Sequence, residues 1–220
     1  MASPKPAAFV PPACAKSGLP PAFTAKFIGA CFNHFARDDA FYLRTHDQNW
    51  MVDVGSARTV SAAQWLRFME RNRIADFSGV ILSHQDEDHR GGLEKICALS
   101  PIKEIVSLDS DPATAPPQYP GYILRSTLKK GAANGEMNGV VTYLGQDQVL
   151  INLGDSSVAL ENQFLPVLQK LRAQDQTTHP WNYRILKLSH HGSATSSGAA
   201  LLAFLRPQEI WVSYGMGNSY

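Results

Sequence analysis

The chain has 220 residues, of which 44% are hydrophobic and 18% charged, and its formal net charge is +1 at pH 7. This length gives one domain as the default and allows a substantial core. The near-neutral charge provides no global basic field of the kind many nucleic-acid-binding proteins carry, and no apolar run reaches transmembrane length. The three cysteines, Cys14, Cys31 and Cys97, indicate neither a disulfide framework nor a zinc finger.

The first 22 residues are rich in Pro and Ala and lack the continuous apolar segment of a signal peptide. We expect a flexible N-terminal extension at 1–22, followed by a single domain at 23–220. With neither a signal peptide nor a transmembrane segment in the sequence, we expect a cytoplasmic protein without membrane contact.

Hydrophobic periodicity predicts most of the regular elements. Alternating or continuous apolar segments indicate strands, whereas apolar residues at helical spacing indicate helices. Ser61 and Gln64 form a capping-box pattern at the start of a helix. Four prolines between 109 and 121 exclude regular structure there and predict a loop near the site. The expected strands are 23–31, 40–45, 49–54, 80–83, 102–108, 140–144, 148–153, 184–189 and 209–213, and further helices are expected at 93–99, 160–172 and 199–205.

The most informative segment is His84-Gln-Asp-Glu-Asp-His89, which directly follows the apolar run 80–83. Imidazole and carboxylate groups packed this densely would repel one another or stay solvated unless a cation held them together. The alternative is a polar loop with incidental histidines. We favour metal ligation because the segment lies between a predicted strand and a helix that begins at two glycines.

Other predicted strands also end in chemically competent side chains. Asp53 ends one strand, Asp155 follows another, and the pair His190-His191 follows a third. A Gly-Asp pair such as Gly154-Asp155 is a common turn when taken alone. The convergence of four strand ends is therefore stronger than any single motif, and it predicts one site.

These segments resemble the metallo-β-lactamase superfamily, whose usual motif is His-x-His-x-Asp-His after a strand. Here Asp86 replaces the second His. This variant, followed by Gly-Gly-Leu, is similar to the β-lactamase-like domain of ComEC-type DNA-uptake proteins and their stand-alone relatives, as is the later His-His-Gly-Ser element. The resemblance extends from about Phe27 to Tyr220. It implies an α/β fold, the αββα sandwich, in which two mixed β-sheets lie face to face with helices outside and a metal site at one edge.

The resemblance also implies a set of site residues. One metal would take His84, Asp86 and Asp155, and the other Asp88, His89, Asp155 and His190. Asp88 and His191 would act in catalysis, Asp53 would orient the ligand loop by hydrogen bonds, and Lys187, Ser193 and Asn138 would contact substrate. Asn138 could instead form a turn, and Ser196 or Ser197 could simply cap the helix at Ala199. Asp39 matches the acidic residue of the family's first loop, but the glycines of that loop are missing, so it receives no role.

No histidine occurs between Cys97 and Ser157, where lactamase, lactonase and glyoxalase relatives have a metal ligand. The resemblance therefore implies a hydrolase of phosphodiester bonds, a DNase-like nuclease that acts on DNA with a metal-activated hydroxide. The oxygen-rich donor set makes Mn²⁺ or Mg²⁺ suitable beside Zn²⁺, with one or two ions bound. Two alternatives stay open: a small-molecule hydrolase of thioesters, lactones or cyclic nucleotides, and a non-catalytic binding module with a degenerate metal site.

The C-terminal segment Ser213-Tyr-Gly-Met-Gly-Asn-Ser-Tyr220 resembles an element after which relatives continue with Gly-His-Pro. The chain stops where that His would come. We interpret this either as truncation of the domain or as a lineage in which a protein partner or a second copy closes the site at the C-terminal edge.

Overall fold

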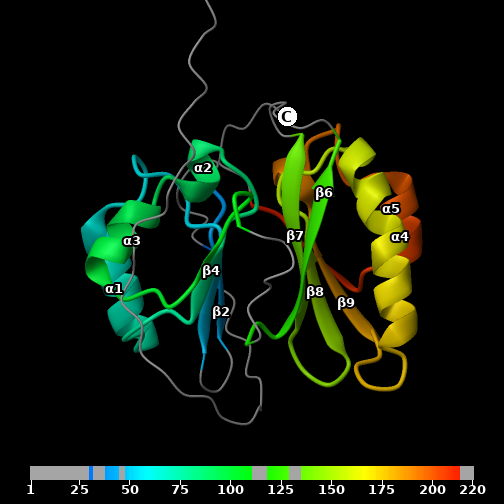
Figure 1. The fold of residues 1–220 in the computed structure, drawn as a ribbon, viewed down its shortest axis with the longest axis horizontal. Coiled ribbons are helices and arrows are strands. Elements are labelled where there is room, and N and C mark those ends of the chain that lie inside the picture. The colour runs from blue at the N-terminus through cyan, green and yellow to red at the C-terminus, as the bar shows by residue number, and fades with distance from the viewer. Residues whose placement is uncertain (1–29, 32–37, 45–47, 111–117, 129–134, 214–220) are drawn as a thin grey trace, which may run out of the picture.

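The computed structural model describes residues 30–31, 38–44, 48–110, 118–128 and 135–213. Two five-stranded sheets pack face to face at the centre, with helices on their outer faces (Figure 1). Each sheet contains parallel and antiparallel pairs. The predicted sandwich of two mixed sheets flanked by helices is therefore confirmed, and it is consistent with the metallo-β-lactamase fold.

The first sheet has the order β1-β2-β3-β4-β5, and helices α1 and α3 cover its outer face (Figure 1). The short helix α2 follows β4 in the chain and carries part of the histidine-rich segment. The strands are β1 (Ala30–Cys31), β2 (Phe41–Arg44), β3 (Asn49–Val52), β4 (Gly79–Ile81) and β5 (Ile105–Val106), and the helices are α1 (Ala62–Asn72), α2 (Glu87–Arg90) and α3 (Leu93–Leu99).

The second sheet has the order β10-β9-β8-β7-β6, and helices α4 and α5 cover its outer face (Figure 1). A 3₁₀ turn at Ser189–Gly192 follows β9. The strands are β6 (Gly121–Thr127), β7 (Glu136–Tyr143), β8 (Gln148–Asn152), β9 (Tyr183–Lys187) and β10 (Glu209–Trp211), and the helices are α4 (Val158–Gln174) and α5 (Ala199–Leu205).

The strands at the centre bury both faces, which explains why they are continuously apolar in sequence. In β3, Trp50 and Val52 face the layer between the sheets, and Met51 faces the helices. In β8, Leu150 faces the layer between the sheets and Ile151 faces α4 and α5. Three apolar layers therefore hold the sandwich together, one between the sheets and one under each helix pair.

Local signals in the sequence also have the expected structural effect. Ser61 Oγ accepts a hydrogen bond from the Gln64 backbone, and the Gln64 side chain accepts one from the Ser61 N–H, so the predicted capping box is confirmed. Helices α3 and α5 have the predicted bounds. No helix in the described part of the chain is long and apolar enough to span a bilayer.

Several expectations differ from the structure or lie outside the described residues. Strand β6 was not predicted, and β7 begins at Glu136 rather than at Val140, because these two strands pair along their whole length. Strand β5 is shorter than 102–108, since Ile102 forms only an isolated bridge. The N-terminal extension at 1–22 and the segment 214–220 lie outside the described residues, as does most of the strand expected at 23–31.

Candidate metal centre

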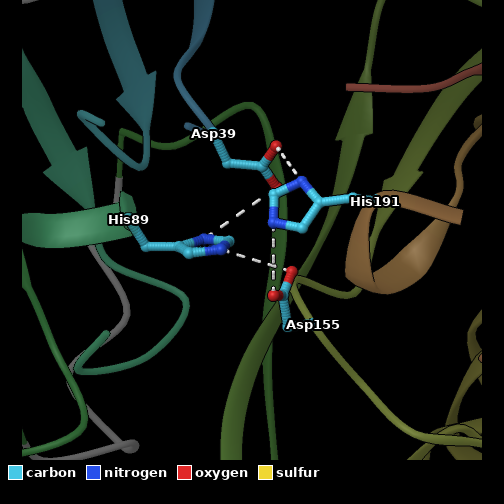
Figure 2. Close-up of side chains that lie close together, drawn as sticks. All are labelled: Asp39, His89, Asp155 and His191. Carbon is cyan, nitrogen blue, oxygen red and sulfur yellow. Dashed lines mark ion pairs between the residues drawn. The ribbon is translucent and has the colours of Figure 1, made fainter. Parts of the chain in front are cut away.

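Acidic and histidine side chains from separate parts of the chain gather between the two sheets (Figure 2). Asp39 precedes β2, His89 lies on α2, Asp155 follows β8, and His191 lies in the 3₁₀ turn after β9. One ligand-type atom from each residue lies within 4.8 Å of those of the others, and all four residues are buried. The sandwich therefore brings the ends of both sheets to one cluster.

The centre of the cluster is the carboxylate of Asp155. Its Oδ1 lies 3.3 Å from His89 Nε2, and its Oδ2 lies 3.5 Å from His191 Nε2. His191 Nε2 also lies 3.5 Å from Oδ2 of Asp88. These four side chains therefore surround one small volume with two imidazole nitrogens and carboxylate oxygens.

His84 and Asp86 extend the cluster on one side. His84 Nε2 lies 3.4 Å from Asp86 Oδ2, and the ring centroids of His84 and His89 are 4.0 Å apart. The Asp86 side chain is 51% exposed and that of Asp88 is 35% exposed, whereas the imidazoles are buried. The two aspartates therefore form the side of the cluster that faces solvent.

The hydrogen bonds to Nδ1 show which nitrogen of each imidazole is left for a ligand. His89 Nδ1 lies 2.8 Å from the Asp53 carboxylate and His191 Nδ1 lies 3.0 Å from a backbone carbonyl, so both nitrogens must donate. His84 Nδ1 contacts Ser83 Oγ. Because Ser83 Oγ donates its own proton to Asp53, it must accept a hydrogen bond from His84 Nδ1. In all three rings, Nε2 is the nitrogen that remains to bind a cation.

Buried atoms without hydrogen-bond partners mark the same volume. They are Nε2 of His84, His89 and His191 and Oδ1 of Asp155. Buried polar atoms without a hydrogen bond are rare, and the polar contacts of these atoms at 3.3 to 3.5 Å are with other members of the cluster. A divalent cation takes imidazole and carboxylate ligands of this kind, so the residues present fit a metal ion.

His191, and not His190, belongs to this cluster. The sequence favoured His190 as the ligand and His191 as a group facing substrate. Both residues have left-handed backbone, with φ of 47° and 53°, and in this turn the second imidazole lies against Asp155. We therefore assign the ligand position to His191.

Asp39 lies on the opposite side of the imidazoles from Asp155. It is 3.5 Å from His191 Nδ1 and 3.9 Å from His89 Nδ1, which are the nitrogens that do not face the candidate metal. Its carboxylate also accepts hydrogen bonds from Lys187 Nζ and Ser213 Oγ. Sequence reasoning gave Asp39 no role, although it occupies the acidic position of the family's first loop. We place it beneath the ligands rather than among them.

Asp53 has the contacts that its predicted orienting role requires. Its carboxylate accepts hydrogen bonds of 2.7 Å from both the N–H and the Oγ of Ser83, and it holds His89 Nδ1 at 2.8 Å. The residue is fully buried and has a left-handed φ of 58°. It therefore links the end of β4 to the imidazole on α2.

Two predicted substrate contacts are occupied within the protein. Lys187 is fully buried and bonds to Asp39, so its ammonium does not face solvent. Asn138 is also buried: it donates to the Leu82 carbonyl at 2.9 Å and accepts from Arg125 Nε at 3.0 Å. In this arrangement burial and long-range partners hold both side chains inside the protein, and their contact with substrate stays a prediction.

The polar cluster after the histidines holds their turn in place. Ser193 Oγ forms a hydrogen bond with Thr195 Oγ1. The contact of Ser193 with substrate stays a prediction. Ser196 Oγ donates to the Ser189 carbonyl at 2.7 Å, and the N–H of Ser189 donates to Ser197 Oγ at 3.2 Å. Neither serine caps α5, whose N-cap is a glycine without a side-chain bond.

A buried glutamate completes this support. The two carboxylate oxygens of Glu161, in the first turn of α4, accept hydrogen bonds of 2.7 Å from the N–H groups of Ser197 and Gly198. Since Ser197 also holds Ser189, the backbone just before the histidine pair is tied to α4. The residue carried no signal in the sequence, because its partners lie 36 and 37 positions away.

The charges of the cluster depend on one another. Burial alone would lower the pKa of His89, but the carboxylates of Asp53 and Asp155 raise it well above 6.5. Burial would likewise raise the pKa of Asp155, but His89 and Lys187 hold it below its usual range. The pKa of His191 is raised against burial by Asp88 and Asp39. In the metal-free protein at neutral pH, Asp155 is therefore ionised and His89 is protonated.

We expect metal binding to release protons, because the ion needs the Nε2 lone pair that a proton holds in the metal-free protein. Since the pKa of His89 is raised, its proton is present below and near neutral pH and is lost as the pH rises through the raised value. Apparent affinity should therefore increase with pH and then level off. Isothermal titration with Mn²⁺ or Zn²⁺ in buffers of different ionisation enthalpy measures the released protons. Binding without proton release at about pH 7 would contradict this expectation.

One protein family matches part of this chain. The family model of the metallo-beta-lactamase superfamily matches residues 38–135. The chain is similar to a solved structure described as a new diphosphatase from the PhnP family, with 10% identity and a TM-score of 0.45, over 81% of this chain and 73% of that one. No curated protein matches the chain. The family match over this part of the chain, the sandwich of two mixed sheets and the buried Asp/His cluster are consistent with the metallo-beta-lactamase fold and with a metal-binding site.

Proposed function

We propose that this protein hydrolyses phosphodiester bonds with a divalent metal ion, and that DNA is its substrate. The observation that carries the metal-dependent part is the convergence of three buried Nε2 atoms and one carboxylate oxygen without hydrogen-bond partners. A divalent ion bound there supplies a Lewis acid for phosphate oxygens and lowers the pKa of a water.

The residues of the chain divide this work between a buried and an exposed side. His89, His191 and Asp155 form the buried side and exclude water from the ligand atoms. Asp88 stands at the boundary: its side chain is 35% exposed, and its Oδ2 lies 3.5 Å from His191 Nε2. A carboxylate at this boundary can accept a proton from an attacking water or complete the ligand set.

The choice of a phosphodiester is supported by the donor set and by the sequence. Asp86 stands where most of the superfamily has His, so Asp86, Asp88 and Asp155 give an oxygen-rich set that suits Mn²⁺ and Mg²⁺ as well as Zn²⁺. The choice of DNA rests on the resemblance of the segments around His84 and His190 to ComEC-type domains. The net charge of +1 adds nothing in favour of nucleic acid.

The test combines metal analysis with three substrates. Metal-depleted protein is reconstituted with Mn²⁺, Mg²⁺ or Zn²⁺ and assayed on linear DNA, bis(p-nitrophenyl) phosphate and nitrocefin. We expect turnover of the two phosphodiesters and none of nitrocefin. His89→Ala should reduce both metal content and turnover by more than about a hundredfold, beyond the usual loss for residues that only orient ligands.

A matched control is available at the far end of the second sheet. His179 stacks on Tyr143, which pairs with Val149 near the start of β8. The candidate site follows the other end of β8, so His179 lies away from it. His179→Ala should therefore leave metal content unchanged. Cleavage of nitrocefin, with DNA untouched, would favour a small-molecule hydrolase. Failure of the purified protein to take up metal would favour a non-catalytic binding module.

A further inference from the structure

A buried ammonium lies directly beneath the candidate metal centre. Lys187 and Asp39 are both fully buried and form an ion pair. Lys187 Nζ also lies 3.4 Å from the Gly154 carbonyl and 3.8 Å from Oδ1 of Asp155. A buried ammonium is tolerated only when an anion and further hydrogen bonds compensate for its lost hydration.

Asp155 is therefore within reach of two different cations. On one side its oxygens face the Nε2 atoms of His89 and His191, where a divalent ion fits. On the other side lies the ammonium of Lys187, just beyond hydrogen-bond distance. If this ammonium bonded to Asp155, it would occupy the oxygen that a metal ion needs and would repel the ion.

We propose that Asp39 is a positioning residue that keeps the Lys187 ammonium off Asp155 and so leaves both Asp155 oxygens for the divalent ion. Asp39 performs this role because it presents Oδ2 to Lys187 while Ser213 Oγ donates to its Oδ1. This inference rests on the metal centre proposed above and is independent of the substrate.

A second role for Asp39 makes a different prediction. Its carboxylate lies 3.5 Å from His191 Nδ1 and 3.9 Å from His89 Nδ1, so it could act by orienting the imidazoles. In that case the loss of Asp39 would weaken metal binding whether or not Lys187 is present. If Asp39 acts on Lys187, removing the ammonium as well restores binding.

The experiment compares Asp39→Asn with the double variant Asp39→Asn/Lys187→Met. Asn keeps an oxygen for Ser213 but places an NH₂ group against the ammonium, which then lacks its acceptor. Met keeps the unbranched length of Lys without the charge. Metal-depleted proteins are titrated calorimetrically with Mn²⁺ and with Zn²⁺, and circular dichroism verifies that each variant is folded.

We expect Asp39→Asn to bind the ion about 10-fold to 100-fold more weakly than wild type, as for other residues that support ligands. The double variant should recover most of that loss. The matched control is Asp76→Asn, which removes the partly exposed ion pair with Lys103 and should change nothing.

Two results would overturn this inference, and they are distinguishable. A double variant that is folded but binds as weakly as Asp39→Asn would show that Asp39 acts on the imidazoles. If Asp39→Asn alone fails to fold, the double variant is compared with wild type: affinity close to wild type supports the inference, and a loss of about 10-fold or more contradicts it. A wild-type protein that takes up no ion would overturn the metal centre itself.

Discussion

Replacing His191 with Ala is expected to abolish tight metal binding and phosphodiester hydrolysis, with losses of more than about a hundredfold in each. His191 Nε2 lies 3.5 Å from both Asp88 and Asp155, is buried and has no hydrogen-bond partner. Its Nδ1 is held by the Ser213 carbonyl, so the ring is already oriented. The variant therefore removes a candidate ligand whose ring the protein already orients.

His190 provides the matched control for this experiment. It is the neighbouring residue, has the same left-handed backbone and lies outside the buried cluster. Because both residues have positive φ, substitution by Ala imposes a similar backbone penalty at the two positions. His190→Ala should change the free energy of metal binding by less than about 0.5 kcal/mol. Loss of metal in His190→Ala and its retention in His191→Ala would reverse our assignment.

The sequence predicted the ends of the strands better than the directions of the side chains that follow them. The segment 84–89 and residue Asp155 were placed in one site because four strands end in polar residues, and the structure brings these ends together. The alternation rule of a strand gives no direction beyond its last residue. The two left-handed residues after β9 therefore decided between His190 and His191, and only the fold shows them.

Long-range pairing explains what the sequence could not reveal. Lys187 was expected to contact substrate, but it is fully buried and paired with Asp39, which is 148 residues away in the chain. Strand β6 was missed because Arg125 and Ser126 interrupt its apolar pattern. Its bonds to β7, and those of Arg125 to the Ser107 and Ser110 carbonyls, are tertiary contacts. Whether a charged residue can be buried depends on a partner that is distant in the chain, and the local sequence pattern does not identify that partner.

Replacing Asp53 with Asn is expected to weaken metal binding by about 10-fold to 100-fold, although the side chain keeps its size and shape. Asp53 now forces His89 to donate from Nδ1, so Nε2 is free for the ion. An Asn that keeps its oxygen on the Ser83 N–H presents an NH₂ group to His89. His89 must then accept at Nδ1 and carry its proton on Nε2, which is the wrong tautomer for a ligand.

Comparison with Asp53→Ala separates the tautomer from simple loss of contact. Asn tolerates the left-handed φ of 58° at this position better than Ala, and it still satisfies the Ser83 N–H. Asp53→Asn should therefore unfold at a higher temperature than Asp53→Ala in the metal-free state, yet bind Mn²⁺ or Zn²⁺ no more tightly. Thermal unfolding and calorimetric titration of the two variants measure both quantities. Wild-type affinity in Asp53→Asn would contradict the proposal that Asp53 sets the tautomer in which His89 binds the ion through Nε2.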